Sequence, residues 1–213
     1  MIAIAKVINQ QQPDLVALQE VDVHTNRSGK QLNQAAELAR QTGMKAYFAK
    51  AIDYDGGEYG VAILSKHPIE NTQVYKLPTA ADTNGEPRVL ATAVVIINGK
   101  RLRFASTHLD AQRSDTNRLL QVQQIVNLLQ TDSLPVIIAG DLNAAPGSPV
   151  INIFDRAFTR TCVNCAFTIP VINPTKTIDF IAYTGSFTVK DHKVIAETYA
   201  SDHLPVMAVL NMQ

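Results

Sequence analysis

The chain contains no tryptophan, only two cysteines, and no excess of either charge. Lys and Arg together number 19, and so do Asp and Glu, which makes the formal net charge zero. Proteins that bind long nucleic acids usually carry a basic surplus, because neutralising phosphates supplies much of their affinity. The charge balance therefore disfavours a dedicated polynucleotide-binding protein, although it is compatible with a local basic patch.

Long apolar runs are missing as well. No stretch approaches the roughly 18–20 apolar residues that a membrane helix needs. The first six residues also lack the charged start, apolar run and small-residue cleavage site of a signal peptide. We therefore predict a soluble protein without a membrane span. As written it would be cytoplasmic, and it would be secreted or periplasmic if a leader peptide has been removed.

The two cysteines, Cys162 and Cys165, stand in a C-x-x-C spacing. This spacing is found in redox pairs and in halves of zinc sites. A zinc site needs two more ligands at a recognisable spacing, and none follows. One alternative is a structural metal site that also uses His192. The favoured interpretation is a pair of thiols in a loop or at a sheet edge, free or oxidised to each other.

Short apolar segments alternate with helical patterns along all 213 residues, and 46% of the residues are hydrophobic. Helical spacing predicts helices over residues 2–10, 32–42 and 116–130. Apolar runs predict strands over residues 15–19, 61–64, 89–97, 102–107, 136–139, 178–182 and 206–210, and Asn98-Gly99 predicts a tight hairpin. This order indicates an α/β fold. Two sheets packed face to face, or one doubly wound sheet, would both satisfy it.

Polar side chains that can bind a metal or move a proton lie at the ends of these strands. They are Glu20, His108, Asp110, Asp141, Asn143, Asp202 and His203. Each alone has an ordinary explanation, such as a solvated charge at Glu20 or a turn at Asp141 and Asn143. Together they offer hard oxygen ligands for Mg²⁺ and imidazoles for proton transfer, which is the chemistry that phosphoryl transfer needs.

Five short segments resemble motifs of one known family. They are Leu18-Gln19-Glu20, Ser106-Thr107-His108-Leu109-Asp110, Gly140-Asp141-Leu142-Asn143, Ile178-Asp179-Phe180 and Ser201-Asp202-His203-Leu204-Pro205. In this order they resemble the endonuclease/exonuclease/phosphatase superfamily, and the similarity extends to its bacterial metal-dependent hydrolases. The resemblance implies one domain over residues 1–213, with a four-layer α/β/β/α sandwich of two mixed sheets flanked by helices.

The resemblance also implies roles for individual residues. Glu20 would be the main metal ligand and Asp202 a second one. Asp141 would orient or deprotonate the attacking water, and His203, oriented by Asp179, would contact the phosphate or act as the base. Asn143 would donate to a phosphate oxygen, and His108 would stabilise the developing charge or protonate the leaving group. Tyr59 and Arg88 would contact the phosphate or the rest of the substrate.

One part of the family pattern has no counterpart in this chain. The family begins with a strand that carries an Asn, and this sequence starts at the helix that follows. We therefore expect an N-terminally truncated domain whose first strand is missing. The missing strand would be central in its sheet, so its loss would leave unpaired backbone groups at an open edge.

The expected function is that of a metal-dependent phosphoesterase that hydrolyses a phosphodiester or phosphomonoester by in-line attack of water. The expected cofactor is Mg²⁺ or Mn²⁺, with Ca²⁺ as a further option. The substrate would be a nucleic acid, a phospholipid head group or a sugar phosphate, and the protein is predicted to be a monomer. The competing hypothesis is a catalytically impaired or non-enzymatic binding protein that keeps the fold.

Overall fold

The structure contains the helices and strands that the sequence predicts, together with several that it does not. The computed structural model describes residues 1–213. The first half contains α1 (Ile2–Gln11), β1 (Leu15–Val23), α2 (Gln34–Thr42), β2 (Lys45–Tyr54), β3 (Gly57–Ser65), β4 (Ile69–Lys76), β5 (Val89–Ile97) and β6 (Lys100–His108). The second half contains α3 (Thr116–Leu129), β7 (Val136–Asp141), α4 (Pro149–Phe154), β8 (Thr159–Arg160), β9 (Asp179–Thr184), β10 (Phe187–Val194) and β11 (Val206–Met212).

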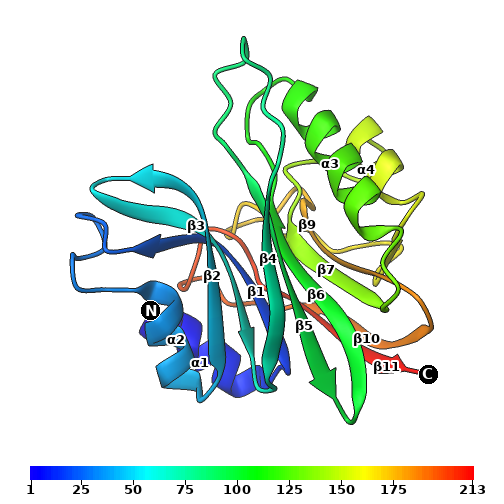
Figure 1. The fold of residues 1–213 in the computed structure, drawn as a ribbon, viewed down its shortest axis with the longest axis horizontal. Helices are drawn as coiled ribbons and strands as arrows, with labels where there is room; N and C mark the ends of the chain where they lie inside the picture. The colour runs from blue at the N-terminus through cyan, green and yellow to red at the C-terminus, as the bar shows by residue number, and fades with distance from the viewer.

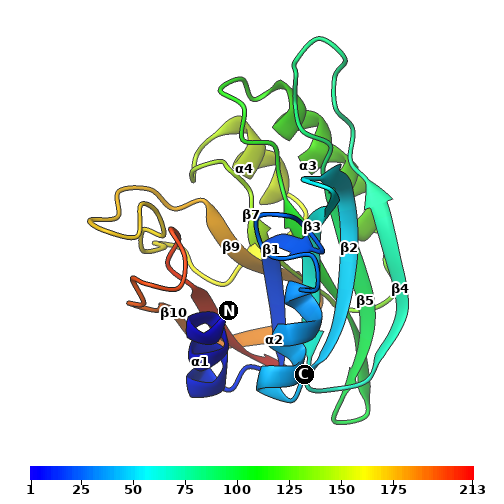
Figure 2. The same ribbon diagram turned by 90° about the vertical axis from the view of Figure 1, so that its left-hand side faces the viewer.

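The strands form two layers between two pairs of helices (Figures 1 and 2). One layer is a six-stranded sheet in the order β4-β5-β6-β7-β9-β8, in which only β6 and β7 run parallel. The other consists of a three-stranded sheet, β1-β3-β2, and the hairpin β10-β11. Helices α3 and α4 lie on the far side of the molecule from α1 and α2. The predicted four-layer fold is confirmed.

The second layer differs from a complete mixed sheet in two respects. All of its strand pairs are antiparallel, so it contains no mixed sheet, contrary to the prediction. The layer is also interrupted, because β1 pairs only with β3 and β11 pairs only with β10. The expectation that a first strand is missing stays a prediction.

The apolar core has a separate region on each face of the sheets. One cluster packs α3 and α4 against the six-stranded sheet and includes Val122, Ile151 and Phe154. A second lies between the two strand layers and includes Phe104 and Ile137. A third joins α1 and α2 to their sheet. Burial on both faces accounts for the continuous apolar runs of the central strands.

Several local signals act as predicted. Asn98 and Gly99 both have positive φ, at 52° and 76°, and join β5 to β6 as the two-residue hairpin requires. Helix α2 begins after Asn33, whose side chain accepts a hydrogen bond from the backbone N–H of Ala36. It ends at Gly43, which is left-handed at φ 67°.

Some elements were not predicted. No helix was predicted for the segment that contains Pro149, yet it forms α4, in which Pro149 occupies the first turn and Ser148 caps the helix. Strand β4 lacks an apolar pattern because it is an exposed edge strand. Strands β2 and β10 also carry many exposed residues, so apolar and polar residues do not alternate regularly along them.

The cysteines are bonded to each other in a disulfide between Cys162 and Cys165. His192 instead meets Thr161, with 2.8 Å between its Nδ1 and the Thr161 Oγ1. The alternative of a structural metal site made by these three residues is therefore wrong, since neither sulfur remains as a thiolate. None of the helices has the length and apolar character needed to cross a lipid bilayer.

Gly140 is required where β7 passes β6. A Cβ atom added to Gly140 would lie 2.1 Å from the carbonyl oxygen of Thr107, which is backbone and cannot turn aside. We expect Gly140→Ala to lower the free energy of unfolding by about 3 kcal/mol, through overpacking next to the strand ends. Urea denaturation measures this loss.

Gly99→Ala is the matched control for this prediction. A Cβ atom there meets nothing within 4 Å, and only its positive φ of 76° opposes the change. Its cost should be about 1 kcal/mol. Equal losses in the two variants would contradict the close approach at Gly140.

Candidate active site

Strand register brings three of the predicted residues to one edge of the six-stranded sheet. His108 is the last residue of β6, and it is the register partner of Asp141 at the end of β7. Asp141 is in turn the partner of Asp179, the first residue of β9. Because β9 runs antiparallel to β7, its beginning lies at the same edge as the ends of β6 and β7. The side chains therefore lie on three neighbouring strands.

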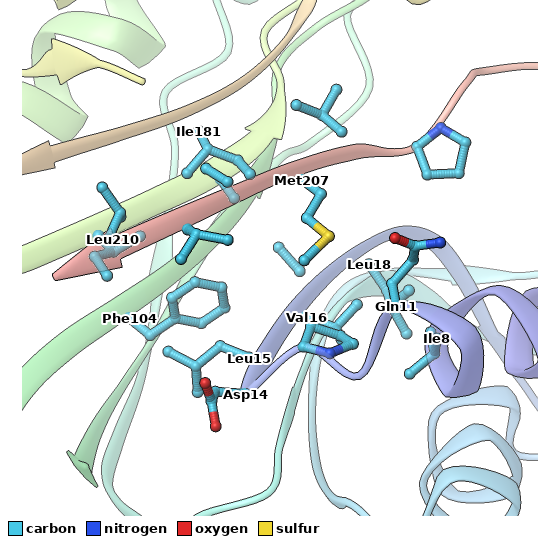
Figure 3. A pocket seen from close by; sticks show the side chains of 18 of the residues that line it. Ile8, Gln11, Asp14, Leu15, Val16, Leu18, Phe104, Ile181, Met207 and Leu210 are labelled. Carbon is cyan, nitrogen blue, oxygen red and sulfur yellow. The ribbon is translucent and has the colours of Figure 1, made fainter. Parts of the chain in front are cut away.

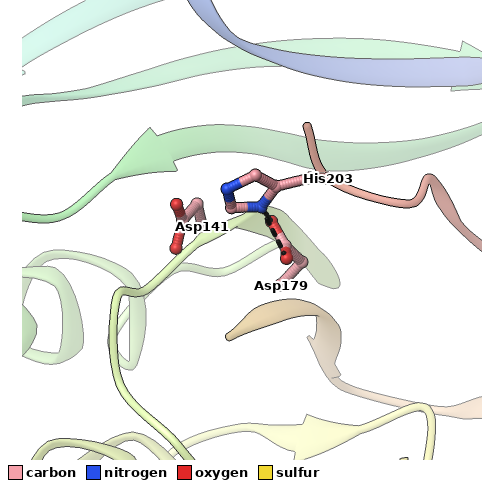
Figure 4. Close-up of side chains that lie close together, drawn as sticks. All are labelled: Asp141, Asp179 and His203. Atoms are coloured by element: carbon pink, nitrogen blue, oxygen red, sulfur yellow. Dashed lines mark hydrogen bonds and ion pairs between the residues drawn. The ribbon is translucent and has the colours of Figure 1, made fainter. Parts of the chain in front are cut away.

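His203 completes this group from the segment that leads into β11. Its Nδ1 lies 3.0 and 3.1 Å from the two carboxylate oxygens of Asp179. The other ring nitrogen faces Asp141, as Figure 4 shows. The hydrogen bond to Asp179 raises the pKa of His203 to about 9, and the negative charge of Asp141 adds to this. His203 is therefore an imidazolium at neutral pH.

Asp141 is the most strongly perturbed carboxylate of the site. It is 6% exposed, and this burial raises its pKa to about 7, with the charge of Asp179 adding to the effect. One of its oxygens accepts a hydrogen bond from the backbone N–H of Asn143 at 2.7 Å. A carboxylate with a pKa near 7 is suited to exchange protons at neutral pH.

His108 is held as a neutral imidazole. The guanidinium of Arg88 can only donate, and its Nη1 lies 3.1 Å from Nδ1 of His108. Nδ1 is therefore the acceptor, and the proton of the ring resides on Nε2. Burial, with the positive charge of Arg88, lowers the pKa of His108 to about 3. Nε2 lies 3.5 Å from a carboxylate oxygen of Asp141, so this N–H faces the cluster.

Asn143 lies at the rim, with positive φ at 47°. Its side-chain N–H₂ donates one hydrogen bond to the carbonyl oxygen of Leu109 at 3.0 Å. The second hydrogen of this group has no partner among the protein hydrogen bonds. Tyr59 is buried next to Arg88, and burial followed by the charge of Glu20 raises the pKa of its phenol.

Glu20 does not end β1 as predicted, because the strand continues to Val23. Leu18 pairs with Ala62 and Val21 with Gly60, so Gln19 and Glu20 together oppose a single residue of β3. This is a β-bulge, and Glu20 has positive φ at 56°. Bulges re-aim side chains and are common next to active sites. The Glu20 side chain is exposed and has no hydrogen bond or ion pair within the protein.

The side chain of Asp110 is buried and makes a structural contact to α3. It is 1% exposed and accepts a hydrogen bond from the side chain of Asn117 on α3, at 3.2 Å. The side-chain oxygen of Gln121, on the same helix, accepts a hydrogen bond from the backbone N–H of Asp110 at 2.9 Å. Asp110 therefore anchors α3 to the end of β6 and does not join the cluster.

Asp141, Asp179 and His203 are the one set of at least three His, Cys, Asp or Glu side chains whose ligand atoms lie within 4.8 Å of one another. Both oxygens of Asp179 are already within hydrogen-bonding distance of His203, so these two residues form an ion pair. The predicted ligands Glu20 and Asp202 are outside this set. Asp202 is exposed, and its side chain has only a 3.4 Å contact with Ser201. Their role as metal ligands stays a prediction.

Sequence reasoning missed the contact between Arg88 and His108. Arg88 as a whole is 7% exposed, and its guanidinium also pairs with Glu86 at 3.0 Å. The expected contact of Arg88 with the substrate stays a prediction. The signal was present in the Glu86-Pro87-Arg88 segment, which precedes the strand paired with β6. Only the antiparallel pairing of β5 with β6 brings that segment next to His108.

Solved structures share this fold. A functionally unknown conserved protein from Enterococcus faecalis is 22% identical, with a TM-score of 0.83 over 99% of this chain and 90% of its own. A mannosyl-6-phosphatase from Bacteroides thetaiotaomicron is 20% identical, with a TM-score of 0.79 over 98% and 89%. D. rerio TDP2, crystallised with a single-strand DNA product, is 17% identical, with a TM-score of 0.75 over 98% and 90%.

A family model described as the endonuclease/exonuclease/phosphatase family matches residues 1–203. The matched range includes β6, β7 and β9, which carry His108, Asp141 and Asp179, and it ends on His203. Because the match spans nearly the whole chain and every member of the cluster, this chain belongs to the endonuclease/exonuclease/phosphatase family.

Proposed function

We propose that this protein is a phosphoesterase that hydrolyses a phosphate ester by in-line attack of water with the help of a divalent cation. The observation that carries the proposal is the arrangement of Asp141, which has a pKa near 7, against the ion pair of His203 and Asp179. A proton acceptor and an imidazolium thus face one another. Hydrolysis of a phosphate ester needs both, one for the water and one for the anionic phosphate.

The base is Asp141 in this proposal. His203 is protonated at neutral pH because Asp179 stabilises its charge, so it cannot accept a proton from water. It is suited to bind a phosphate oxygen as a cation. Asp141 is ionised above a pH of about 7 and has one oxygen that is not bonded to the backbone N–H of Asn143.

His108 donates a hydrogen bond in this proposal. With its pKa near 3 it is neutral at pH 7 and cannot serve as a strong acid. Its Nε2–H can stabilise charge on a phosphate oxygen, as can the unpartnered hydrogen of the Asn143 amide. Tyr59 and Arg88 line the same region, and Arg88 acts by holding His108.

Glu20 and Asp202 are the proposed ligands of the cation. Both are exposed carboxylates, and Glu20 has no partner within the protein, so their oxygens are free to bind a hard ion such as Mg²⁺ or Mn²⁺. Once bound, such an ion would neutralise charge on the phosphate and on the leaving oxygen. Enzymes of this family generally use divalent metal ions, which supports the assignment.

The substrate is proposed to be a small phosphate ester, such as a sugar phosphate. Zero net charge disfavours long nucleic acids. The structural neighbours include both a mannosyl-6-phosphatase and a protein bound to a DNA product, so neighbours alone do not choose between the two. A panel of phosphomonoesters, phosphodiesters and short DNA, each with Mg²⁺, Mn²⁺ or Ca²⁺ and with EDTA, tests the proposal. Turnover of none of them with any metal would favour the alternative of a fold-retaining binding protein.

Arg88 is expected to control which nitrogen of His108 carries the proton. In Arg88→Met the donor to Nδ1 is lost, so the ring can adopt the other tautomer and turn its N–H away from the cluster. We expect kcat to fall about 10–100-fold, as for residues that orient a functional histidine. Nitrogen NMR of labelled histidine should show the Nε2–H tautomer of His108 in the parent and a mixture in the variant.

Arg103→Met is the matched control, because Arg103 pairs with Asp132 away from the cluster. It should leave both kcat and the His108 signals unchanged. An unaltered His108 tautomer in Arg88→Met would show that Arg88 does not hold the ring.

A further inference from the structure

The disulfide between Cys162 and Cys165 lies at the surface, just beyond the edge of the sheet that carries the candidate site. Both cysteines are partly exposed, and Val163 in the turn between them is 88% exposed. The turn follows β8, which pairs with β9, the strand that begins with Asp179. The disulfide is therefore accessible to a small thiol in the folded protein.

Arg160 directs a hydrogen-bond donor at one of the two sulfur atoms. Its Nε and Nη2 donate to the two carboxylate oxygens of Asp155, at 2.8 and 3.0 Å, which fixes the guanidinium. Its Nη1 then lies 3.6 Å from Sγ of Cys165. Asp155 offsets part of the positive charge, but the N–H that remains stabilises a thiolate at Cys165. Because a more stable thiolate leaves faster in thiol–disulfide exchange, Cys165 is the better leaving group of the pair.

Thr168, in the loop that follows the disulfide, joins the two segments that carry Asp179 and His203. Its Oγ1 accepts a hydrogen bond from the backbone N–H of Ile178 at 3.3 Å, and its carbonyl oxygen accepts one from Leu204 at 2.8 Å. Each of these donors is the direct neighbour of a member of the ion pair. Thr168 is fully buried, so it has little freedom to move while the loop is in place.

The segment that carries His203 depends on this loop for its backbone contacts. Residues 201–204 make two backbone hydrogen bonds with other segments, and both are with the loop. One is the bond to Thr168, and in the other Val171 donates to the carbonyl oxygen of Asp202 at 2.9 Å. The same segment borders an apolar cavity of about 800 Å³ between β1 and β11 (Figure 3). The loop after the disulfide is thus the backbone support of the histidine.

We propose that this disulfide is a site of thiol–disulfide exchange, and that its reduction loosens the hold of Thr168 on Asp179 and His203. Thr161, before the disulfide, is fixed by two hydrogen bonds to the carbonyl oxygen of Ile181, at 2.9 and 3.0 Å. A crosslink stabilises by excluding conformations of the chain that it closes, so its loss gives the stretch between Thr161 and Thr168 more freedom. Control of catalysis in this way rests on the proposed function, whereas exchange and loosening do not.

The co-reactant is a dithiol. One of its thiolates attacks Sγ of Cys162, the bond between the two cysteines breaks, and Cys165 leaves as a thiolate beside the N–H of Arg160. The second thiolate of the dithiol then attacks the dithiol sulfur of the mixed disulfide, which closes a cyclic disulfide and releases Cys162. Two electrons pass from the dithiol to the cysteine pair, and the two protons that the dithiol lost complete the two thiols.

Dithiothreitol tests the exchange on the folded, metal-free protein without substrate. Alkylation followed by mass spectrometry measures the two thiols that are released. We expect Arg160→Met to slow the reduction about tenfold, because Cys165 then leaves without the N–H donor. Asp155→Asn is the matched control, since it removes the same ion pair but keeps the guanidinium, and it should not slow the reduction.

Hydrogen exchange at backbone amides tests the loosening. In the reduced protein the amide of Leu204 should exchange at least tenfold faster than in the oxidised protein, because its acceptor is less firmly held. The double variant Cys162→Ser/Cys165→Ser should show the same fast exchange with or without dithiothreitol. The amide of Leu109, which donates to a carbonyl oxygen at the end of β7, should be unchanged in all of these samples.

The proposal is overturned if the disulfide is reduced only in denaturant, or if Arg160→Met is reduced as fast as the parent. Equal exchange of the Leu204 amide in the two redox states would also overturn it. Hydrolysis of a phosphate ester by the parent should fall about tenfold on reduction, because catalytic groups are displaced, and should return on reoxidation. A parent without hydrolysis would contradict the proposed function, and the exchange measurements would still decide this inference.

Discussion

Asp141→Asn is expected to lose about 10²–10⁴-fold in kcat, the usual contribution of a general base. The same variant should melt at a higher temperature than the parent at pH 8 in EDTA. Both effects have one cause, which is the placement of an ionisable carboxylate at a site where it is 6% exposed. An amide keeps the shape and can still accept the backbone N–H of Asn143, but it cannot take a proton from water.

The sign of the stability change follows from the pKa. Burial raises the pKa of Asp141 from its usual 3.8 to about 7, so the folded state favours the protonated form. The stability that this group contributes is complete below about pH 4 and is lost as the pH rises to about 7. At about 1.4 kcal/mol for each pKa unit the ceiling is about 4 kcal/mol, and this value already includes the attraction to His203. Because relaxation and water penetration reduce the penalty of a buried charge, we expect a gain of about 1–3 kcal/mol.

Urea denaturation at several pH values measures this prediction. The difference between Asp141→Asn and the parent should be small at pH 4 and should reach a plateau above about pH 7.5. Asp179→Asn is the matched control, because Asp179 stabilises the charge of His203 and its loss should lower stability at neutral pH. A variant that is inactive and also less stable than the parent at pH 8 would contradict a buried, proton-accepting Asp141.

Glu20→Ala is expected to lower kcat about 10³-fold while leaving the fold intact. The rate loss corresponds to about 4 kcal/mol of transition-state stabilisation, a typical contribution of a bound cation. Stability should change by less than about 0.5 kcal/mol, because the side chain is exposed and has no partner within the protein. If Glu20 is a ligand, the affinity for Mn²⁺ must fall as well, which electron paramagnetic resonance of the free ion measures.

Glu70→Ala is the matched control for this loss. Glu70 is another exposed glutamate, on the edge strand β4, and its substitution should leave rate and Mn²⁺ affinity unchanged. Full activity in Glu20→Ala would remove the proposed role of Glu20. Lost activity with unchanged Mn²⁺ affinity would instead show that Glu20 acts on the substrate and that the cation is bound elsewhere.

Local features of the fold could be predicted from the sequence, whereas features that depend on long-range strand pairing could not. The hairpin at Asn98 and Gly99 was predictable because both residues adopt positive φ readily, a local property. The end of β1 could not be predicted, because the bulge at Glu20 arises from pairing with β3, which lies far along the chain. Helix α4 was not predicted because its six residues are too few to show a helical pattern, although Pro149 is tolerated in the first turn of a helix.

In the candidate site, too, the residue types could be predicted from the sequence, whereas their protonation states and contacts could not. Residue types and strand ends pointed to His108, Asp141, Asn143 and His203, since imidazoles and carboxylates at strand ends are suited to phosphate chemistry. Their protonation states could not be predicted, because a pKa depends on burial and on neighbouring charges. Arg88 was assigned to the substrate, and its contact with His108 became visible only once β5 was paired with β6.

The amino-acid sequence by itself determined the order of helices and strands, the family motifs and the identity of the chemical groups. These are encoded in local patterns, where each residue needs only its near neighbours in the chain. The tertiary structure decided that His203 meets Asp179, that Asp141 holds its proton up to a pH of about 7, and that Arg88 lies against His108. Each of these depends on the distance between residues far apart in the chain, which long-range strand register determines and local patterns do not contain.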